Sequence, residues 1–123
     1  MNRRIALALV ALVALVATIT ASVAMASSHK KSAVIPVTVR MFDYGFKLSR
    51  TSVPKGSTVR FTVLNTGKTV HNFDLQGYKS TPISGPKSKK IMTVVLKKAG
   101  KIQYVCDVPR HAELGMTGTF TVK

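Results

Sequence analysis

The most informative stretch of the 123-residue sequence runs from Cys106 to Met116 and places a cysteine, a histidine and a methionine in the order C-x4-H-x4-M. A second histidine, His71, lies upstream in an apolar segment. Two imidazoles and one thiolate in a trigonal plane, with a weak axial thioether, form the blue-copper arrangement. Thiolate and thioether ligands suit Cu(I), and imidazole suits copper more generally. We therefore predict one copper ion, Cu(II)/Cu(I), with the ligands His71, Cys106, His111 and Met116.

Each of these residues also has an ordinary structural interpretation. Cys106 could pack as a small hydrophobic residue, and Met116 could fill space in the core. His71 could be a hydrogen-bonded core histidine, and His111 an ordinary loop residue. The four types occur together, in the right order and between expected strands, which favours the metal site. His29 lies in a basic stretch near the N-terminus, and we predict that it is not a ligand.

Short segments of alternating polarity predict the elements that hold these side chains. Apolar and polar residues alternate at 35–41, 59–63 and 102–106, which is the period of a half-buried strand. Turn residues separate them, as in Val53-Pro54-Lys55-Gly56. Further strands are predicted at 46–48, 70–75, 91–96 and 117–122, with a loop that could include an edge strand at 77–88. Short strands at near-regular spacing indicate an all-β sandwich or barrel.

Over residues 34–123 the sequence resembles the cupredoxin family, which are type 1 copper proteins. The segments that carry the resemblance are Val53–Gly56, Val59–Asn65, Val70–Phe73 and Tyr104–Gly118. The resemblance implies an all-β, Greek-key β-sandwich of seven or eight strands with one copper ion at one end. It implies that Asn72 hydrogen-bonds across to the ligand loop near Cys106. It also implies that His111 lies near the surface in an apolar patch, where electrons enter or leave.

The N-terminal segment has the features of a secretory signal peptide. Arg3 and Arg4 precede an uncharged apolar run, and small residues end in Ala24-Met25-Ala26. We predict a signal peptide at 1–26, a flexible basic lead-in at 27–33 and one domain at 34–123. The location is then extracytoplasmic: periplasmic, secreted or membrane-associated. A retained membrane anchor is the alternative, because the uncharged stretch is long enough to span a bilayer.

The charge of the chain is strongly basic, with 19 Lys and Arg against four Asp and Glu, a net charge of +15. Without Arg3 and Arg4 it is +13, since 17 basic residues then face four acidic ones. Such a surface favours a redox partner with acidic groups or an anionic membrane surface. The lysines could equally serve only to keep the surface solvated. No nucleic-acid recognition motif is present in the sequence, so we predict no nucleic-acid partner, and a monomer.

Three kinds of function compete for the same residues. One-electron transfer between redox partners is the first, and a complete His-Cys-His-Met set favours it. Copper trafficking or storage outside the cytoplasm is the second. An enzyme is the third: a multicopper oxidase would need more histidines than the chain has, and a Cys-His hydrolase could be built from Cys106 with a histidine. We predict that the protein is not an enzyme.

Overall fold

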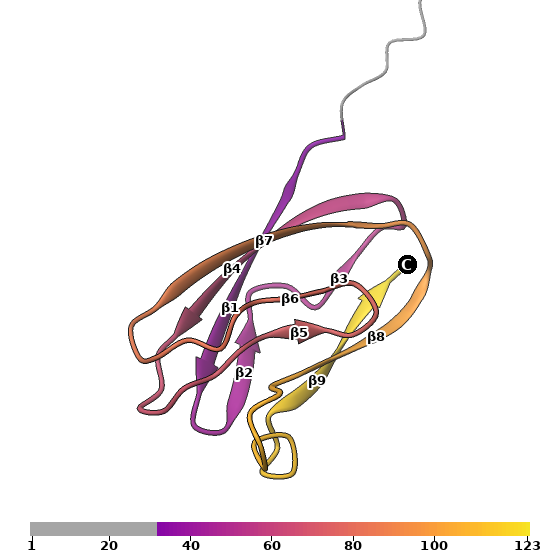
Figure 1. Cartoon of the computed structure of the whole chain (residues 1–123). Coiled ribbons are helices and arrows are strands. Elements are labelled where there is room, and N and C mark those ends of the chain that lie inside the picture. The colour runs from indigo at the N-terminus through magenta and orange to yellow at the C-terminus, as the bar shows by residue number, and fades with distance from the viewer. Residues whose placement is uncertain (1–31) are drawn as a thin grey trace, which may run out of the picture.

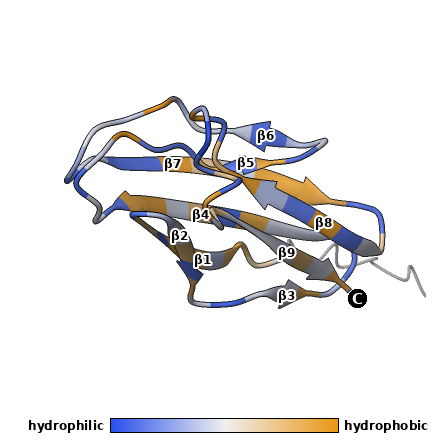
Figure 2. Cartoon of the chain, turned by 90° about the horizontal axis from the view of Figure 1, so that it is seen from below, coloured by the Kyte–Doolittle hydropathy of each residue, from blue (hydrophilic) through white to orange (hydrophobic). Residues whose placement is uncertain are grey.

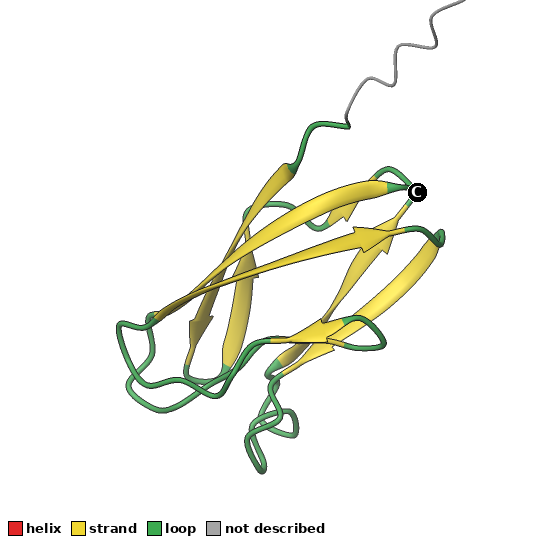
Figure 3. Cartoon of the chain, turned by 45° about the horizontal axis from the view of Figure 1, so that its top comes forward, coloured by secondary structure: helices red, strands yellow, loops and turns green. Residues whose placement is uncertain are grey.

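Two β-sheets face each other in the computed structural model, which describes residues 32–123 (Figures 1 and 3). One sheet has four strands in the order β2-β1-β4-β7 and the other has five in the order β3-β9-β8-β5-β6. The strands are β1 Ile35–Phe42, β2 Gly45–Leu48, β3 Ser52–Val53, β4 Ser57–Asn65, β5 Asp74–Leu75, β6 Lys79–Ser80, β7 Lys89–Leu96, β8 Gly100–Val105 and β9 Thr117–Val122. Within residues 32–123 no helix could cross a membrane. The predicted β-sandwich is confirmed.

The four-stranded sheet is built on alternating residues whose apolar members face inward. β1 pairs with β4 in parallel and with β2 in an antiparallel hairpin, and β4 pairs antiparallel with β7. Val37, Val39 and Met41 are at most 1% exposed, whereas Arg40 points outward. This alternation fixes the register, because a slip by one residue would expose the apolar face.

The five-stranded sheet holds both ends of the ligand-bearing loop. β8 and β9 are antiparallel neighbours in register from Gly100↔Val122 to Val105↔Thr117. The loop between them begins at Cys106 and ends at Met116. Because β8 and β9 are paired at their loop ends, Cys106 and Met116 start from adjacent points of one sheet.

A cluster of aromatic rings fills the space between the sheets beneath the loop end. Phe61 and Phe73 are fully buried, and their ring centroids are 5.5 Å apart. Tyr104 lies 5.3 Å from Phe73, and Phe120 lies 5.5 Å from Phe61. Apolar residues recur along the strands in Figure 2. Such rings bury much apolar area and pack in tilted or edge-to-face pairs, so they form a firm base for the site above them.

The predicted strand at 70–75 is wrong over most of its length. Only Asp74–Leu75 forms a strand, and His71 makes an isolated bridge with Ser84. Side chains take the place of a continuous ladder: the Phe73 backbone N–H donates to Thr81 Oγ1 at 3.0 Å. The strand count is nine instead of seven or eight because three strands have only two residues.

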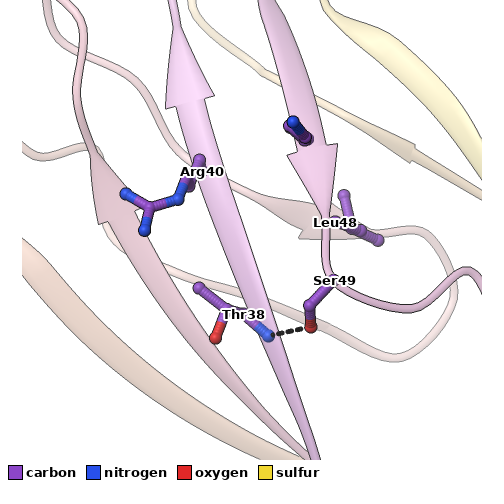
Figure 4. Close-up of a pocket in the computed structure, with 5 residues that line it drawn as sticks. Thr38, Arg40, Leu48 and Ser49 are labelled. Carbon is purple, nitrogen blue, oxygen red and sulfur yellow. Dashed lines mark hydrogen bonds between the residues drawn. The ribbon is translucent and has the colours of Figure 1, made fainter.

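A groove of about 320 Å³ lies on the outer face of the β1–β2 pair. Figure 4 shows Thr38, whose backbone N–H donates to Ser49 Oγ at 2.9 Å, and Arg40 on the same strand. Arg40 lies directly opposite Lys47 in the strand register. None of the four predicted ligands lines this groove, so it is a basic surface feature separate from the metal centre.

Candidate metal centre

Three predicted ligands from two distant parts of the chain meet at one buried point. His71 Nδ1 and His111 Nδ1 are 3.1 Å apart. Cys106 Sγ lies 3.6 Å from His111 Nδ1 and 3.9 Å from His71 Nδ1. His71 is fully buried, Cys106 is 1% exposed and His111 is 9% exposed. These are the only His, Cys, Asp or Glu side chains among residues 32–123 that form a metal-ligating group of three.

The size of this triangle suits a metal ion at its centre. Bonds from a metal to imidazole nitrogen and thiolate sulfur are ~2.0 to 2.3 Å long, which leaves neighbouring donors roughly 3.3 to 3.8 Å apart. The observed separations of 3.1, 3.6 and 3.9 Å bracket that range. Two nitrogens and one sulfur, each a good ligand for copper, therefore fit the cofactor in both chemistry and spacing.

Met116, the fourth predicted ligand, is fully buried at the far end of the loop. The Met116 backbone N–H donates to the His111 carbonyl at 3.0 Å, and the Met116 carbonyl accepts from the Cys106 backbone N–H at 3.1 Å. The backbones of the three loop residues are thus hydrogen-bonded to one another. Gly115, with φ of 108°, supplies the left-handed backbone that lets the loop return to β9.

Asn72 joins the two ligand-bearing segments, as the family resemblance implied. Its Oδ1 accepts from the Asp107 backbone N–H at 2.7 Å, and its Nδ2 donates to Asp107 Oδ2 at 2.6 Å. The same Nδ2 donates to Ser80 Oγ at 3.0 Å. Because Asn72 follows His71 and Asp107 follows Cys106, these bonds fix the spacing of two ligands. The prediction for Asn72 is confirmed.

Asp43 is a neighbour of the site that sequence reasoning missed. It lies in the turn of the β1–β2 hairpin, and its Oδ1 is 2.6 Å from His71 Nε2. The pKa of Asp43 is about 2, lowered first by the backbone N–H of Lys68 and then by His71 and Thr69, against an opposing effect of desolvation. Asp43 is therefore an anion at neutral pH, in direct contact with one predicted ligand.

The next residue in the hairpin, Tyr44, covers the side of His111. The two ring centroids are 4.8 Å apart in an edge-on arrangement. Leu114, in the ligand loop, is 57% exposed. Desolvation, followed by the proximity of His71, lowers the pKa of His111, so its imidazole is neutral and has a free lone pair at neutral pH. His111 thus lies just under the surface, beside exposed apolar and aromatic side chains.

A β-sandwich with two histidines and one cysteine converging beside a buried methionine defines the class of type 1 copper proteins. A model of the cupredoxin-like domain matches residues 10–122, and the chain belongs to the cupredoxin family. The site accordingly takes one copper ion, and the protein is one of electron transport. His29 lies outside the described residues.

Solved structures agree with the fold. Reduced rusticyanin is 28% identical, with a TM-score of 0.63 over 73% of this chain and 79% of its own. Reduced auracyanin from the photosynthetic bacterium Roseiflexus castenholzii is 20% identical, with a TM-score of 0.62 over 75% of this chain and 98% of its own. A chain of a heme-copper terminal oxidase dimer is 19% identical, with a TM-score of 0.63 over 79% of this chain and 68% of its own. The similarities to auracyanin and to the oxidase chain are evidence of the fold alone. No curated protein sequence matches the chain.

Proposed function

We propose that the protein is a one-electron carrier outside the cytoplasm, with His71, Cys106, His111 and Met116 as the ligands of its copper ion. The observation that carries this proposal is the buried triangle of two Nδ1 atoms and one Sγ, with separations of 3.1 to 3.9 Å. Bound copper supplies the Cu(II)/Cu(I) couple. The chain supplies a fixed donor set, so that the oxidation state changes with little rearrangement.

The protein's own side chains explain why the site suits repeated electron transfer. Burial of Cys106 and His71 keeps water away from the donors, and the Asn72–Asp107 bonds hold their segments together. His111 is the most exposed of the four, at 9%. We place the route of the electron through its ring, because it is the only one of the four side chains that reaches solvent to this extent.

Copper trafficking or storage uses the same ligands and is the second candidate. A delivery protein gains from an exposed metal that it can release, whereas all four ligands here are buried. The two functions separate experimentally by the rate at which a chelator removes copper, compared with the rate of electron exchange with a redox dye. Slow removal with fast exchange is expected for the carrier.

Hydrolase chemistry at Cys106 has little structural support. Cys106 is 1% exposed, and the Nδ1 atoms of both histidines lie within 3.9 Å of its Sγ in the buried interior. A nucleophile has to reach its substrate. Within residues 32–123 no second group of metal-ligating side chains exists that could make a multicopper centre.

For the partner, we propose a redox protein with acidic groups on its surface. All four acidic residues of the sequence lie at the copper end: Asp43 beside His71, Asp107 after Cys106, Asp74 next to Asp107, and Glu113 in the ligand loop. Two basic residues lie there as well, Arg110 in the ligand loop and Lys68 beside Asp43. Most of the basic excess therefore belongs to the rest of the chain, including Arg40 and Lys47 on the outer sheet face. An anionic membrane surface would be attracted by the same charges.

The extracytoplasmic location is supported by the apolar N-terminal segment with its A-x-A end.

An absorption spectrum of the purified, copper-loaded protein tests the proposed site. An intense band at the red end of the visible spectrum is expected from a Cu(II)–thiolate bond, and Cys106→Ala should abolish it. If Cys106→Ala binds copper with the same intense band, the ligand assignment is wrong. His111→Ala should keep the fold but weaken both colour and copper affinity, because it opens the site to water.

A further inference from the structure

The Asp43 carboxylate is surrounded by donors from one short segment, residues 68–71. Its Oδ2 accepts from the Lys68 backbone N–H at 2.7 Å. Its Oδ1 accepts from the Thr69 hydroxyl at 3.1 Å and from the Thr69 backbone N–H at 3.4 Å. The same Oδ1 faces His71 Nε2 at 2.6 Å, the shortest of these contacts. The hairpin between β1 and β2 is thus tied to the segment that carries a predicted copper ligand.

The contact with Asp43 determines which nitrogen of His71 carries the proton. A neutral imidazole has one N–H and one lone pair, and an ionised carboxylate can only accept. The Nε2 atom therefore carries the hydrogen and donates it to Asp43. The lone pair is left on Nδ1, which is the nitrogen that lies 3.1 Å from His111 Nδ1 and 3.9 Å from Cys106 Sγ.

Gly67 shows how closely the carboxylate and the imidazole are fitted to the loop. A Cβ atom at this position would collide with Asp43 Oδ1 and would lie 2.9 Å from His71 Nε2. The Gly67 backbone N–H is held by Asn65 Oδ1 at 2.9 Å. Only a residue without a side chain leaves room for the Asp43–His71 contact, so the loop is shaped around this pair.

We propose that Asp43 is a positioning residue for the copper site, a role that rests on the proposed function. Through its contact at Nε2 it orients the His71 ring and keeps the Nδ1 lone pair directed at the point where His111 Nδ1 and Cys106 Sγ also lie, so that it would be available to bind copper. Its negative charge, transmitted through the imidazole, favours Cu(II) over Cu(I) and so lowers the reduction potential. A hydrogen-bonded carboxylate also raises the basicity of a ligating histidine, which strengthens metal binding. The other interpretation is that Asp43 only fastens the 67–69 loop.

The first test uses the metal-free, unmodified protein and so does not depend on copper or on a variant. Nitrogen-15 NMR of the histidine side chains reports the tautomer of His71. The proposal requires the Nε2–H tautomer at neutral pH. A His71 ring with its proton on Nδ1 would overturn it.

The second test compares Asp43→Asn and Asp43→Ala with Glu113→Gln, which removes one negative charge from the ligand loop. We expect Cu(II) affinity to fall about 10- to 100-fold in Asp43→Ala, as is usual when the partner of a ligating histidine is removed. Cu(I) affinity should fall less, because the smaller charge of Cu(I) gains less from the anion. A tenfold difference between the two losses corresponds to a rise of about 59 mV in a one-electron potential.

Comparison of the variants distinguishes positioning from loop fastening. Asp43→Asn retains an oxygen that can accept from Nε2–H, so it should raise the potential while losing less affinity than Asp43→Ala. Equal potentials in Asp43→Asn, Glu113→Gln and the unmodified protein would overturn the electrostatic role. If Asp43→Ala does not fold, Gly67→Ala can replace it, because the added Cβ displaces the Asp43–His71 contact without removing the charge. An unchanged His71 tautomer and an unchanged copper affinity in Gly67→Ala would count against the proposal. Failure of the unmodified protein to give the intense visible band would instead refute the proposed copper function.

Discussion

Replacing Asn72 with alanine is the sharpest test of how the two ligand-bearing segments are held together. The substitution removes three hydrogen bonds, two to Asp107 and one to Ser80. The Asn72 side chain is 3% exposed, so water cannot simply replace its amide. The Asp107 backbone N–H would lose its partner at the point where the chain leaves Cys106.

The expected loss of stability follows from the kinds of bond involved. A neutral hydrogen bond contributes about 0.5 to 1.5 kcal/mol, and one to a charged group about 1.5 to 3 kcal/mol. Asp107 is exposed, so the bond to its carboxylate belongs at the low end of that range. With two neutral bonds of about 1 kcal/mol each, the total is roughly 3 to 4 kcal/mol. For a domain of this size, each 1 kcal/mol lowers Tm by about 4 to 8 °C, so a fall of at least about 12 °C is expected.

Urea unfolding of the metal-free protein, followed by circular dichroism, measures this loss. The matched control is Thr81→Val, which removes one buried hydrogen bond, the one from the Phe73 backbone N–H, and preserves the shape of the side chain. Thr81→Val should cost about 1 kcal/mol and leave the visible copper band unchanged. Asn72→Ala should cost more and also speed the loss of copper to a chelator. A urea midpoint for Asn72→Ala within experimental error of that of the unmodified protein would refute the reasoning. Lost stability with an unchanged rate of copper release would show that Asn72 stabilises the fold without holding the copper ligands in place.

Three further predictions concern the ligand set, the acidic end and the partner. Met116→Leu should keep copper and colour but raise the potential measured by voltammetry, because a weak thioether ligand would tune the site more than it would anchor the metal. Complete loss of copper would contradict this. Desolvation, followed by the charge of Asp107, raises the pKa of Asp74, so ionisation of Asp74 weakens the fold as pH rises above about 4. In urea titrations, Asp74→Asn should therefore be more stable than the unmodified protein at pH 7 but not at pH 3. In stopped-flow measurements, electron transfer to an acidic redox protein should slow as salt rises toward 0.15 M, where the screening length is about 8 Å. Equal, salt-independent rates with acidic and basic partners would show that the lysines only solvate the surface.

The proposed ligand set could be read from the sequence because most of it is local. Cys106, His111 and Met116 occupy one loop, so their spacing is visible without any knowledge of the fold. Alternation was a good guide where one face of a strand is buried, as in β1 and β4. The apolar run at 91–96 alternates in exposure, with Ile91 58% and Val95 46% exposed, because β7 has one face in solvent.

Asp43 could not be predicted because nothing local marks it. Aspartate is an ordinary residue of turns, and 28 positions separate it from His71. Its role depends on the tertiary path of the β1–β2 hairpin over the 67–71 segment. The strand predicted at 70–75 is wrong for a related reason: its hydrophobic alternation is real, but side chains such as Thr81 provide the hydrogen bonds that a neighbouring strand would otherwise supply.

If the partner is acidic, as proposed, the arrangement of charge would separate tuning of the copper site from attraction of the partner. Basic residues more than about 8 Å from the metal are largely screened by physiological salt, so they have little effect on the potential. Asp43 lies 2.6 Å from His71 Nε2, so in the role proposed above its charge acts through direct contact and is not separated from the ligand by solvent. The four carboxylates around the copper end, only partly offset by Lys68 and Arg110, would repel an acidic partner if that end docked through charge. An acidic partner is therefore best accommodated if its anionic groups meet the basic surface away from the copper end, such as the outer sheet face with Arg40 and Lys47. Its electron-transfer site would then approach His111 past Tyr44 and Leu114, whose apolar surfaces need no counter-charge.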